Sequence, residues 1–486
     1  MKRIISLCGS LLIALCACAP AVVPVENEIE STVEVHISAT QPTEEETKMI
    51  IPKYHGDMTR YDNCTVTANG QSVPVLGVDV NHSRVWSERP KTAKTPMATL
   101  QIGGAVNFQV TYEDVDLTHA IVRPLSAGIV PAIDGKTISF TVTEPGYYTV
   151  EYNEGVEGAL MLFADAIETD IPTAGDSVII LEAGIHDRNI ILQDGQTLYF
   201  KPGAVLRGNV ATHGANDVRI CGYGVIDGSP FDRWDSTLVP IEINNSKNVV
   251  VEGVTVINPA AWMFNTYHCE DVEIRNVKLI SACSNGDGIT TQSCRRLTAR
   301  DCFVRGWDDN LVVKAYDGDV SDILFERCIL WTDLAQSCEV GYETRGELME
   351  NITFRDITVL HNFHKPIASI HNSDSALIRN VRFENITVEE CMLGLGDGQN
   401  IFLELTTTTS QWTKTEKRGN IRDVVFENID IQYGRYPQVR IFAVDAESTI
   451  DDVLFKNITI HGNKITGDGD IRILTNDFVG DNIRWE

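Results

Sequence analysis

The C-terminal half of the chain repeats one pattern of apolar and polar positions. An Asn or Asp precedes alternating apolar residues, often a second Asn or Asp, and an apolar-x-apolar tail. The pattern occurs in NVVVEGVTV from Asn248, DVEIRNVKL from Asp271, LTARDCFV from Leu297, DILFERCIL from Asp322, NITFRDITV from Asn351, NVRFENITV from Asn380, DVVFENIDI from Asp423 and DVLFKNITI from Asp452. Most units recur every 23 to 29 residues, which leaves room for short strands and turns but not for a helix of ordinary length.

Strands this short cannot bury their apolar faces alone, so the units must stack on one another. We therefore expect a parallel β-helix that begins near Ser177, and parallel crossovers make it right-handed. A leucine-rich horseshoe is the competing solenoid, but the units lack its Leu-x-x-Leu-x-Leu spacing. The Asn or Asp of each unit should lie at a turn, with Val, Ile and Phe inside.

Residues 49–170 show a different pattern. Segments such as AVNFQVTYEDVDLTHAIVRPL and KTISFTVTEPGYYTVEYNEG alternate apolar and polar residues between closely spaced Gly and Pro turns. This is typical of an antiparallel β-sandwich. The sequence thus predicts an all-β protein, with a small N-terminal β-sandwich domain (49–170) followed by a β-helix domain (171–486).

The N-terminus has the features of an export signal. A charged head, Met1 to Arg3, precedes a short apolar run and a small-residue cleavage zone. Leu15-Cys16-Ala17-Cys18 resembles a bacterial lipobox, which makes residues 1–18 a lipoprotein signal peptide and Cys18 the lipidated residue; cleavage after Ala19 is the alternative. Residues 19–48 are rich in Pro, Glu and Thr, so we expect a disordered tether that holds an exported protein at the cell surface or facing the periplasm.

Charge and cysteine content exclude some functions. The formal net charge of -28 argues against a nucleic-acid partner and, more weakly, against a polyanionic substrate. Nine cysteines beyond the signal are scattered without metal-ligand spacing, as expected of small buried residues. We expect no cofactor and no metal.

Three aspartates occupy corresponding places in the repeat. Asp287 lies 21 and 22 residues before Asp308 and Asp309, which is close to one coil. Coils stack about 4.8 Å apart, so the carboxylates should form one cluster, and repulsion should raise at least one pKa. Such a cluster suits glycoside hydrolysis, where one carboxylic acid protonates the leaving oxygen and another carboxylate activates water. A solvated turn and a calcium site are the alternatives.

A family resemblance supports the hydrolase interpretation. The segment CGYGVIDGSPFDRW, Cys221 to Trp234, resembles the Gly-x-Gly-x-Ile-Asp-Gly segment of glycoside hydrolase family 28, the polygalacturonases. Asn285-Gly286-Asp287 is similar to the family's Asn-Thr-Asp, and Asp308-Asp309 to its Asp-Asp. The resemblance covers roughly residues 177–396 and implies an inverting mechanism, with Asp308 as general acid and Asp287 and Asp309 activating water.

Two motifs of that family are missing. Gln336, in AQSCEVGYETRGE, stands where the family's Gly-His-Gly has its histidine, and KPIASIHN lacks the expected Arg-Ile-Lys. Lys365 and His371 are the nearest substitutes for the cations that read a uronate carboxylate.

The chain is also similar to the dextranases, glycoside hydrolase family 49. The shared features are an N-terminal sandwich, an Asp-Asp followed by Lys314 in DDNLVVKAY, and the segment GYETR with Tyr342 and Arg345. This resemblance implies a neutral glycan, for example a dextran-like α-glucan.

Further residues near the aspartates are candidates for binding the sugar. They are Asn285, Trp307, Lys314, Trp331, Gln336, Tyr342, Arg345 and His371. The two tryptophans either stack on sugar rings or fill the core, and Lys314 either neutralises the acids or caps a solvated face. The excursion containing Trp412 is predicted to roof the groove, whereas His364 and His371 are more typical of plain turn or groove histidines.

Two other functions remain open from the residues alone. One is a non-catalytic glycan-binding or adhesion β-helix, and the other is a polysaccharide lyase that uses Lys314 as base with calcium. For the favoured hydrolase we expect a polysaccharide or oligosaccharide substrate, a membrane contact only through the lipid anchor, and a monomer.

Overall fold

The computed structural model describes residues 48–81, 91–233, 236, 238–393 and 400–486. The predicted signal peptide, Cys18 and almost all of the tether lie outside these residues, as does Trp234. No helix in the described part of the chain is long and apolar enough to cross a membrane.

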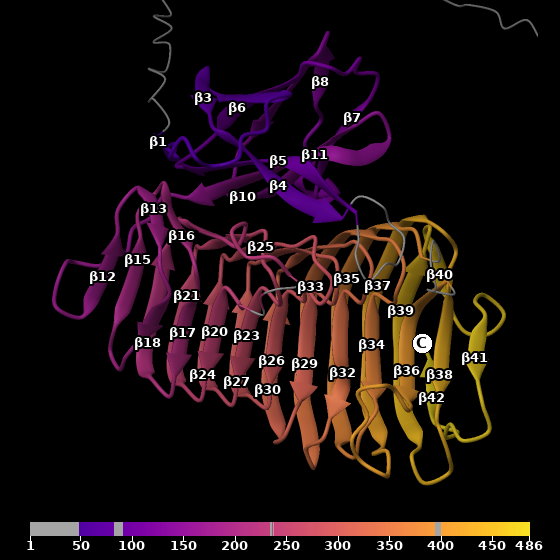
Figure 1. Cartoon of the computed structure of the whole chain (residues 1–486). Coiled ribbons are helices and arrows are strands. Elements are labelled where there is room, and N and C mark those ends of the chain that lie inside the picture. Colours follow the sequence, from indigo (N-terminus) through magenta and orange to yellow (C-terminus); the bar gives the residue numbers. More distant parts are fainter. Residues whose placement is uncertain (1–47, 82–90, 234–235, 237, 394–399) are drawn as a thin grey trace, which may run out of the picture. The chain divides into compact units, whose positions relative to one another are not determined.

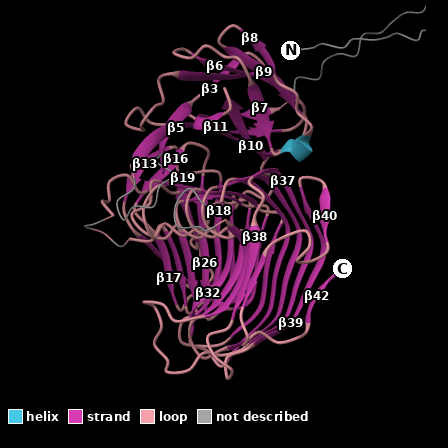
Figure 2. Ribbon diagram, turned by 90° about the vertical axis from the view of Figure 1, so that its right-hand side faces the viewer, coloured by secondary structure: helices cyan, strands magenta, loops and turns pink. Residues whose placement is uncertain are grey.

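Two sheets form the N-terminal region, as the sequence predicts (Figure 1). All strand pairs in them are antiparallel except β5 with β11. One sheet contains β1 (Met49–Ile50), β4 (Val75–Asn81), β5 (Thr92–Ile102), β7 (Ala120–Arg123), β10 (Gly146–Tyr152) and β11 (Gly155–Ala166). The other contains β2 (Cys64–Ala68), β3 (Gln71–Val73), β6 (Val106–Tyr112), β8 (Ala132–Asp134) and β9 (Thr137–Val142). A short 3-10 turn, η1 (Leu125–Ala127), is the cyan segment of Figure 2.

The rest of the chain is a parallel β-helix, whose strands run side by side along the solenoid (Figures 1 and 2). The sheet that carries the candidate site contains β14 (Ile190–Leu192), β17 (Val210–His213), β20 (Ile241–Asn244), β23 (Phe264–Tyr267), β26 (Ile289–Gln292), β29 (Leu311–Ala315), β32 (Cys338–Thr344), β34 (Ala368–Asn372), β36 (Ile401–Thr407), β38 (Gln438–Phe442) and β41 (Ile473–Thr475). We call this sheet the site sheet.

The remaining strands of the solenoid form a second, larger sheet. They are β12 (Val178–Leu181), β13 (Gly184–Asp187), β15 (Thr197–Phe200), β16 (Ala204–Arg207), β18 (Asn216–Gly222), β19 (Val225–Asp227), β21 (Lys247–Glu252), β22 (Thr255–Ile257), β24 (Glu270–Arg275), β25 (Lys278–Ile280), β27 (Arg295–Arg300), β28 (Phe303–Gly306), β30 (Val320–Glu326), β31 (Ile329–Thr332), β33 (Leu348–Asn362), β35 (Leu377–Cys391), β37 (Ile421–Gly434), β39 (Ile450–Ile460), β40 (Asn463–Ile465) and β42 (Ile483–Trp485). The first of them starts one residue after the predicted Ser177.

The repeat aligns the same residue on successive coils. Phe325, Phe354, Phe383, Phe426 and Phe455 form a continuous inner stack, with neighbouring ring centroids 4.9 to 5.1 Å apart. This spacing matches the distance between neighbouring strands of a sheet. Burial of such stacked rings and of the Val and Ile rows around them supplies the hydrophobic stabilisation that single units lack.

The sequence predicts a turn at the polar position of the repeat, but Asn351 lies inside the continuous strand β33 and Asn380 inside β35, so the chain bends there without leaving the strand. Asn351 and Asn380 adopt positive φ values of 57° and 50°, a left-handed conformation that Asn tolerates better than most residues. The side-chain amide of Asn380 donates to Asn351 Oδ1 at 2.7 Å, so the bends also form a side-chain ladder from coil to coil.

The two sequence-predicted regions pack into one compact unit, residues 46–486, so a domain boundary at residue 170 stays a prediction. Lys278 of β25 forms a buried ion pair with Asp165 of β11, at 3.0 Å. None of the nine described cysteines forms a disulfide, and eight of them are buried.

Candidate active site

Asp287 and Asp309 occupy matching positions on neighbouring coils. Ile289 of β26 pairs with Leu311 of β29, two residues further along in each case. The amide of Gly288 donates to the carbonyl of Asp309 at 2.8 Å, which extends the same register to the aspartates. Because the strands are parallel and one rung apart, the two residues lie side by side at the N-terminal edge of the site sheet.

Asp308 joins this pair through the preceding loop. Its Oδ2 accepts a hydrogen bond of 3.1 Å from the backbone amide of Asn285. Asn285 is exposed, and its side-chain oxygen accepts a bond of 2.9 Å from Arg233. The loop before β26 therefore contacts the carboxylate of the next coil, and the three predicted acids form one cluster.

The corner that presents Asp308 and Asp309 is fixed from inside the solenoid. Asn310 is fully buried and donates to the carbonyls of Val304 and Trp331. On the coil before, the backbone of Gly288 approaches so closely that a Cβ there would lie 2.2 Å from the carbonyl oxygen of Asn310. Because successive side chains point to opposite sides of an extended chain, turning Asn310 inward places its neighbour Asp309 on the outer side.

Burial and mutual repulsion alter the ionisation of all three acids. Burial, assisted by the charge of Asp309, raises the pKa of Asp308 to about 7. Burial also raises the pKa of Asp287 and of Asp309, with Lys314 opposing both shifts. A carboxyl group that keeps its proton near neutral pH can act as a general acid.

Lys314 provides the counter-charge of the cluster. Its Nζ lies 3.5 Å from Asp287 Oδ2, 3.4 Å from Glu343 Oε2 and 5.0 Å from the centre of the Trp262 ring. Burial disfavours its charge, but the pKa of Lys314 is raised because Asp287 and Glu343 outweigh that penalty. The ammonium group thus lies inside the acid cluster, in agreement with the neutralising alternative.

A β-bulge delivers Glu343 to this position. Between Val313 and Ala315 of β29 the register with β32 shifts, so that extra residues of β32 face Lys314. Gly341 begins the bulge with a φ of 128°, and a Cβ there would lie 2.3 Å from the carbonyl oxygen of His371. Bulges of this kind re-aim side chains next to active sites.

Gln336 and Tyr342 continue the site onto the next coils. The amide of Gln336 donates to Asp309 Oδ1 at 3.0 Å, and its side chain hydrogen-bonds Tyr342. The ring of Tyr342 stacks on His371, with centroids 4.3 Å apart and planes 8° apart. Gln336 and Tyr342 therefore connect the acids to the outer face of the site sheet.

That outer face carries a row of charged side chains. His371 contacts Glu339 through Nδ1 at 2.7 Å and Glu404 through Nε2 at 3.4 Å, and Glu404 also binds Arg440. Burial opposes the charge of His371, but the two carboxylates raise its pKa to about 10. The row borders a cavity of about 360 Å³, whose lining includes Tyr342, His371, Glu404, Thr406, Arg440 and Phe442. We call it the threonine pocket, after Thr406 and the two threonines that follow it.

The two tryptophans are not exposed, so the sugar-stacking prediction for Trp307 and Trp331 is wrong. Trp331 is fully buried; it donates to Asp333 at 2.9 Å and packs against the tilted ring of His361, with ring centroids 4.2 Å apart. It belongs to a core cluster that includes apolar residues of the N-terminal sheets, such as Met97. Trp307 is 4% exposed. Both act as core fillers.

Arg345 and Trp412 lie near one another, beside Tyr316 and Asp374. The guanidinium of Arg345 lies 4.4 Å from the Tyr316 ring and 3.8 Å from Asp374, and donates to the Trp412 carbonyl at 3.5 Å. Trp412 is 44% exposed, consistent with a loop on the surface. His364 is fully buried.

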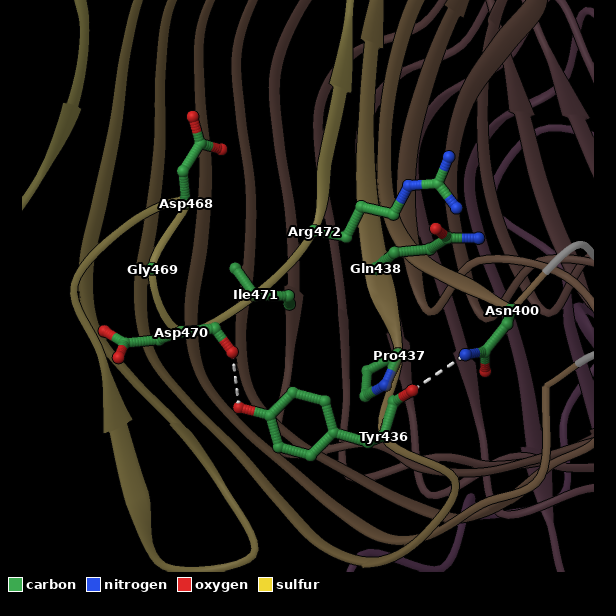
Figure 3. Close-up of a pocket in the computed structure, with 9 residues that line it drawn as sticks. All are labelled: Asn400, Tyr436, Pro437, Gln438, Asp468, Gly469, Asp470, Ile471 and Arg472. Carbon is green, nitrogen blue, oxygen red and sulfur yellow. Dashed lines mark hydrogen bonds between the residues drawn. The ribbon is translucent and has the colours of Figure 1, made fainter.

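A second depression lies farther along the site sheet (Figure 3). It has a volume of about 590 Å³ and is lined by residues that precede or begin β36, β38 and β41, among them Asn400, Gln438 and Arg472. The Asn400 amide donates to the Tyr436 carbonyl, and the Tyr436 hydroxyl donates to the Asp470 carbonyl. The three aspartates do not line it.

Several charged residues of the site were missed from sequence. Glu343, Glu339, Glu404 and Arg440 were not selected, although a glutamate inside an apolar run, as in IFLELT, is a recognisable signal of a polar row on a sheet. Within the described residues no group of three or more His, Cys, Asp or Glu has the geometry to hold a metal ion.

A carboxylate cluster on the outside of a parallel β-helix is the arrangement of a glycoside hydrolase, and the comparisons agree. Residues 205–471, more than half of the chain, match the model of the glycosyl hydrolases family 28, and the chain belongs to that family.

Sequence relatives and a solved structure extend this result. A probable exopolygalacturonase B of Neosartorya fischeri is 24% identical over 245 residues, which cover 44% of this chain and 52% of the relative; its counterpart in Aspergillus terreus is 23% identical over 246 residues, covering 44% and 54%. The chain thus spans about half the length of the curated relatives it matches. Dex49A from Penicillium minioluteum shares the fold, with a TM-score of 0.59, 13% identity, and coverage of 90% of this chain and 96% of that one.

Proposed function

We propose that this glycoside hydrolase cleaves its substrate by inversion, with Asp308 as general acid and with Asp287 and Asp309 holding and activating the attacking water. The observation that carries the proposal is the register that stacks Asp287 beside Asp309 while the Asn285 amide contacts Asp308. Two carboxyl functions on one face supply the acid and the base that the reaction needs.

The proposed step balances as follows. Asp308 gives its proton to the glycosidic oxygen as the bond from that oxygen to the anomeric carbon breaks. The water oxygen bonds to the anomeric carbon from the opposite side, and the water proton passes to Asp287 or Asp309. Lys314, 3.5 Å from Asp287, favours the ionised form that accepts this proton.

We also propose a neutral glycan, such as a dextran-like α-glucan, as substrate. Lys314, His371 and Arg440 are each paired with carboxylates of the protein, which leaves them poorly placed to read a uronate. The names of the two fungal relatives favour galacturonan as the second candidate.

A panel of reducing-sugar assays tests the substrate. Release from dextran or pullulan above that from polygalacturonate or rhamnogalacturonan supports the neutral glycan, and the reverse order rejects it.

We further propose that the protein is exported and anchored through lipidated Cys18, acting as a monomer. Incorporation of labelled palmitate into the full chain, abolished by Cys18→Ala, tests the anchor.

A further inference from the structure

The threonine pocket begins one coil beyond the acids on the same face of the site sheet. Tyr342 on β32 forms one end of its lining, and Arg440 and Phe442 on β38 belong to later coils. Each coil advances about 4.8 Å, so a glycan chain that crosses Asp309 reaches this pocket with its next residues.

The lining has the composition of a sugar subsite. The Phe442 ring is 38% exposed, and Tyr342 is held flat against His371, which gives apolar faces of the kind on which sugar rings pack. The hydroxyl of Thr406 is buried and has no hydrogen-bond partner among the described residues, although Thr406 lines the pocket. A ligand hydroxyl would satisfy this buried polar group.

Glu404 controls the charge of the pocket. Its carboxylate contacts two cations that line the cavity, the imidazole of His371 at 3.4 Å and the guanidinium of Arg440 at 2.5 Å from Nε. The other ring nitrogen of His371 contacts Glu339. Burial opposes the ionisation of Glu404, but His371 and Arg440 outweigh it, and the pKa of Glu404 is lowered.

We propose that the threonine pocket is a subsite for a neutral sugar residue and that Glu404 is the residue that determines this specificity. Glu404 occupies both cations, so the carboxylate of a uronate residue finds no free positive charge and meets a like charge instead. This inference rests on the proposed function, because it assumes that a glycan lies across the acids.

The test measures binding rather than turnover. In the Asp308→Asn background, calorimetry compares isomaltopentaose with pentagalacturonate for the parent and for Glu404→Gln. We expect Glu404→Gln to bind pentagalacturonate at least tenfold more tightly than the parent, because the like charge of Glu404 is removed and the guanidinium of Arg440 can donate to the uronate carboxylate in its place. No gain in a Glu404→Gln protein that melts as a folded protein overturns the inference.

Two controls complete the design. Glu447→Gln removes an equal charge from an exposed pair with Lys417 and should leave both affinities unchanged. Adding Arg440→Met to Glu404→Gln should abolish the gain. If Glu404→Gln does not fold, pentagalacturonate binding to the parent is measured instead. Binding that is lost in the Arg440→Met variant contradicts the inference. No binding to the parent supports it. Normal turnover by Asp308→Asn would instead reject the proposed mechanism, so the two failures are distinguishable.

Discussion

Glu343 and Lys314 lie on neighbouring coils and form an ion pair at the edge of the acid cluster, with 3.4 Å between Oε2 and Nζ. The same ammonium group reaches Asp287 at 3.5 Å. The bulge in β32 creates this arrangement, because a regular strand would place one residue, not three, opposite Lys314. Lys314 is thereby fixed where it can influence the ionisation of the proposed base.

Replacing Lys314 by Met should shift the pH dependence of kcat/KM. Loss of the positive charge raises the pKa of Asp287, so the base is ionised only at higher pH, and the acidic limb should move upward by about one pH unit. Lys417→Met, at an exposed ion pair with Glu447, is the matched control. An unchanged acidic limb in Lys314→Met would show that Lys314 does not act on the base.

Asp308→Asn should reduce kcat by roughly a hundredfold to ten-thousandfold, the usual contribution of a general acid. The amide keeps the shape of the side chain and can still accept the hydrogen bond from Asn285, so the structure should persist. Steady-state assays with the best substrate of the panel measure the loss. Turnover at the parent level in this variant would refute the assignment.

The same variant should become more stable than the parent as pH rises. The pKa of Asp308 is raised by burial and by Asp309 to about 7, so the folded protein holds a proton that the unfolded chain releases near pH 4. The parent therefore loses stability between pH 4 and pH 7, whereas the side-chain amide of the variant does not titrate. Thermal melts should show equal stability at pH 4 and a gain of ~1 to 2 kcal/mol for the variant at pH 8. A constant difference across this range would contradict the raised pKa.

Gly288→Ala should destabilise the site and the fold together. The new Cβ would lie 2.2 Å from the Asn310 carbonyl oxygen and 2.5 Å from Val304 Cγ1, so one coil must move away from the next. We expect a loss of about 2 to 4 kcal/mol in unfolding free energy, with reduced activity. Gly56→Ala, where a Cβ meets no atom within 4 Å, should change neither property. Equal melting temperatures for Gly288→Ala and the parent would show that the contact is not tight.

The repeat and the acid cluster were accessible from sequence because both depend on local, periodic features. Asn351 and Asn380 mark a left-handed bend in their units of the repeat, since few other residues tolerate their positive φ. Once the coil length is known, Asp287 and Asp309 follow from spacing alone, and Lys314 from its place on the strand that follows Asp309. The prediction that Gln336 lies at the site is consistent with its backbone bond to Asp309.

Features that depend on what packs against a coil were not accessible. Trp331 resembles a groove residue in the repeat, but a core shared with the N-terminal sheets covers it. Glu343 reaches Lys314 only through a bulge, which shifts the register that spacing assumes. The pairing of Glu404 with His371 and Arg440 joins three strands separated by long loops, so no sequence spacing reveals it.

The stereochemistry of the product tests the central proposal most directly. Proton NMR of the sugar formed in the first moments of hydrolysis, before mutarotation, reports the configuration of the new anomeric centre. Direct attack by a water held at Asp287 and Asp309 predicts the inverted anomer. A first product with retained configuration would require a covalent intermediate and would contradict the mechanism.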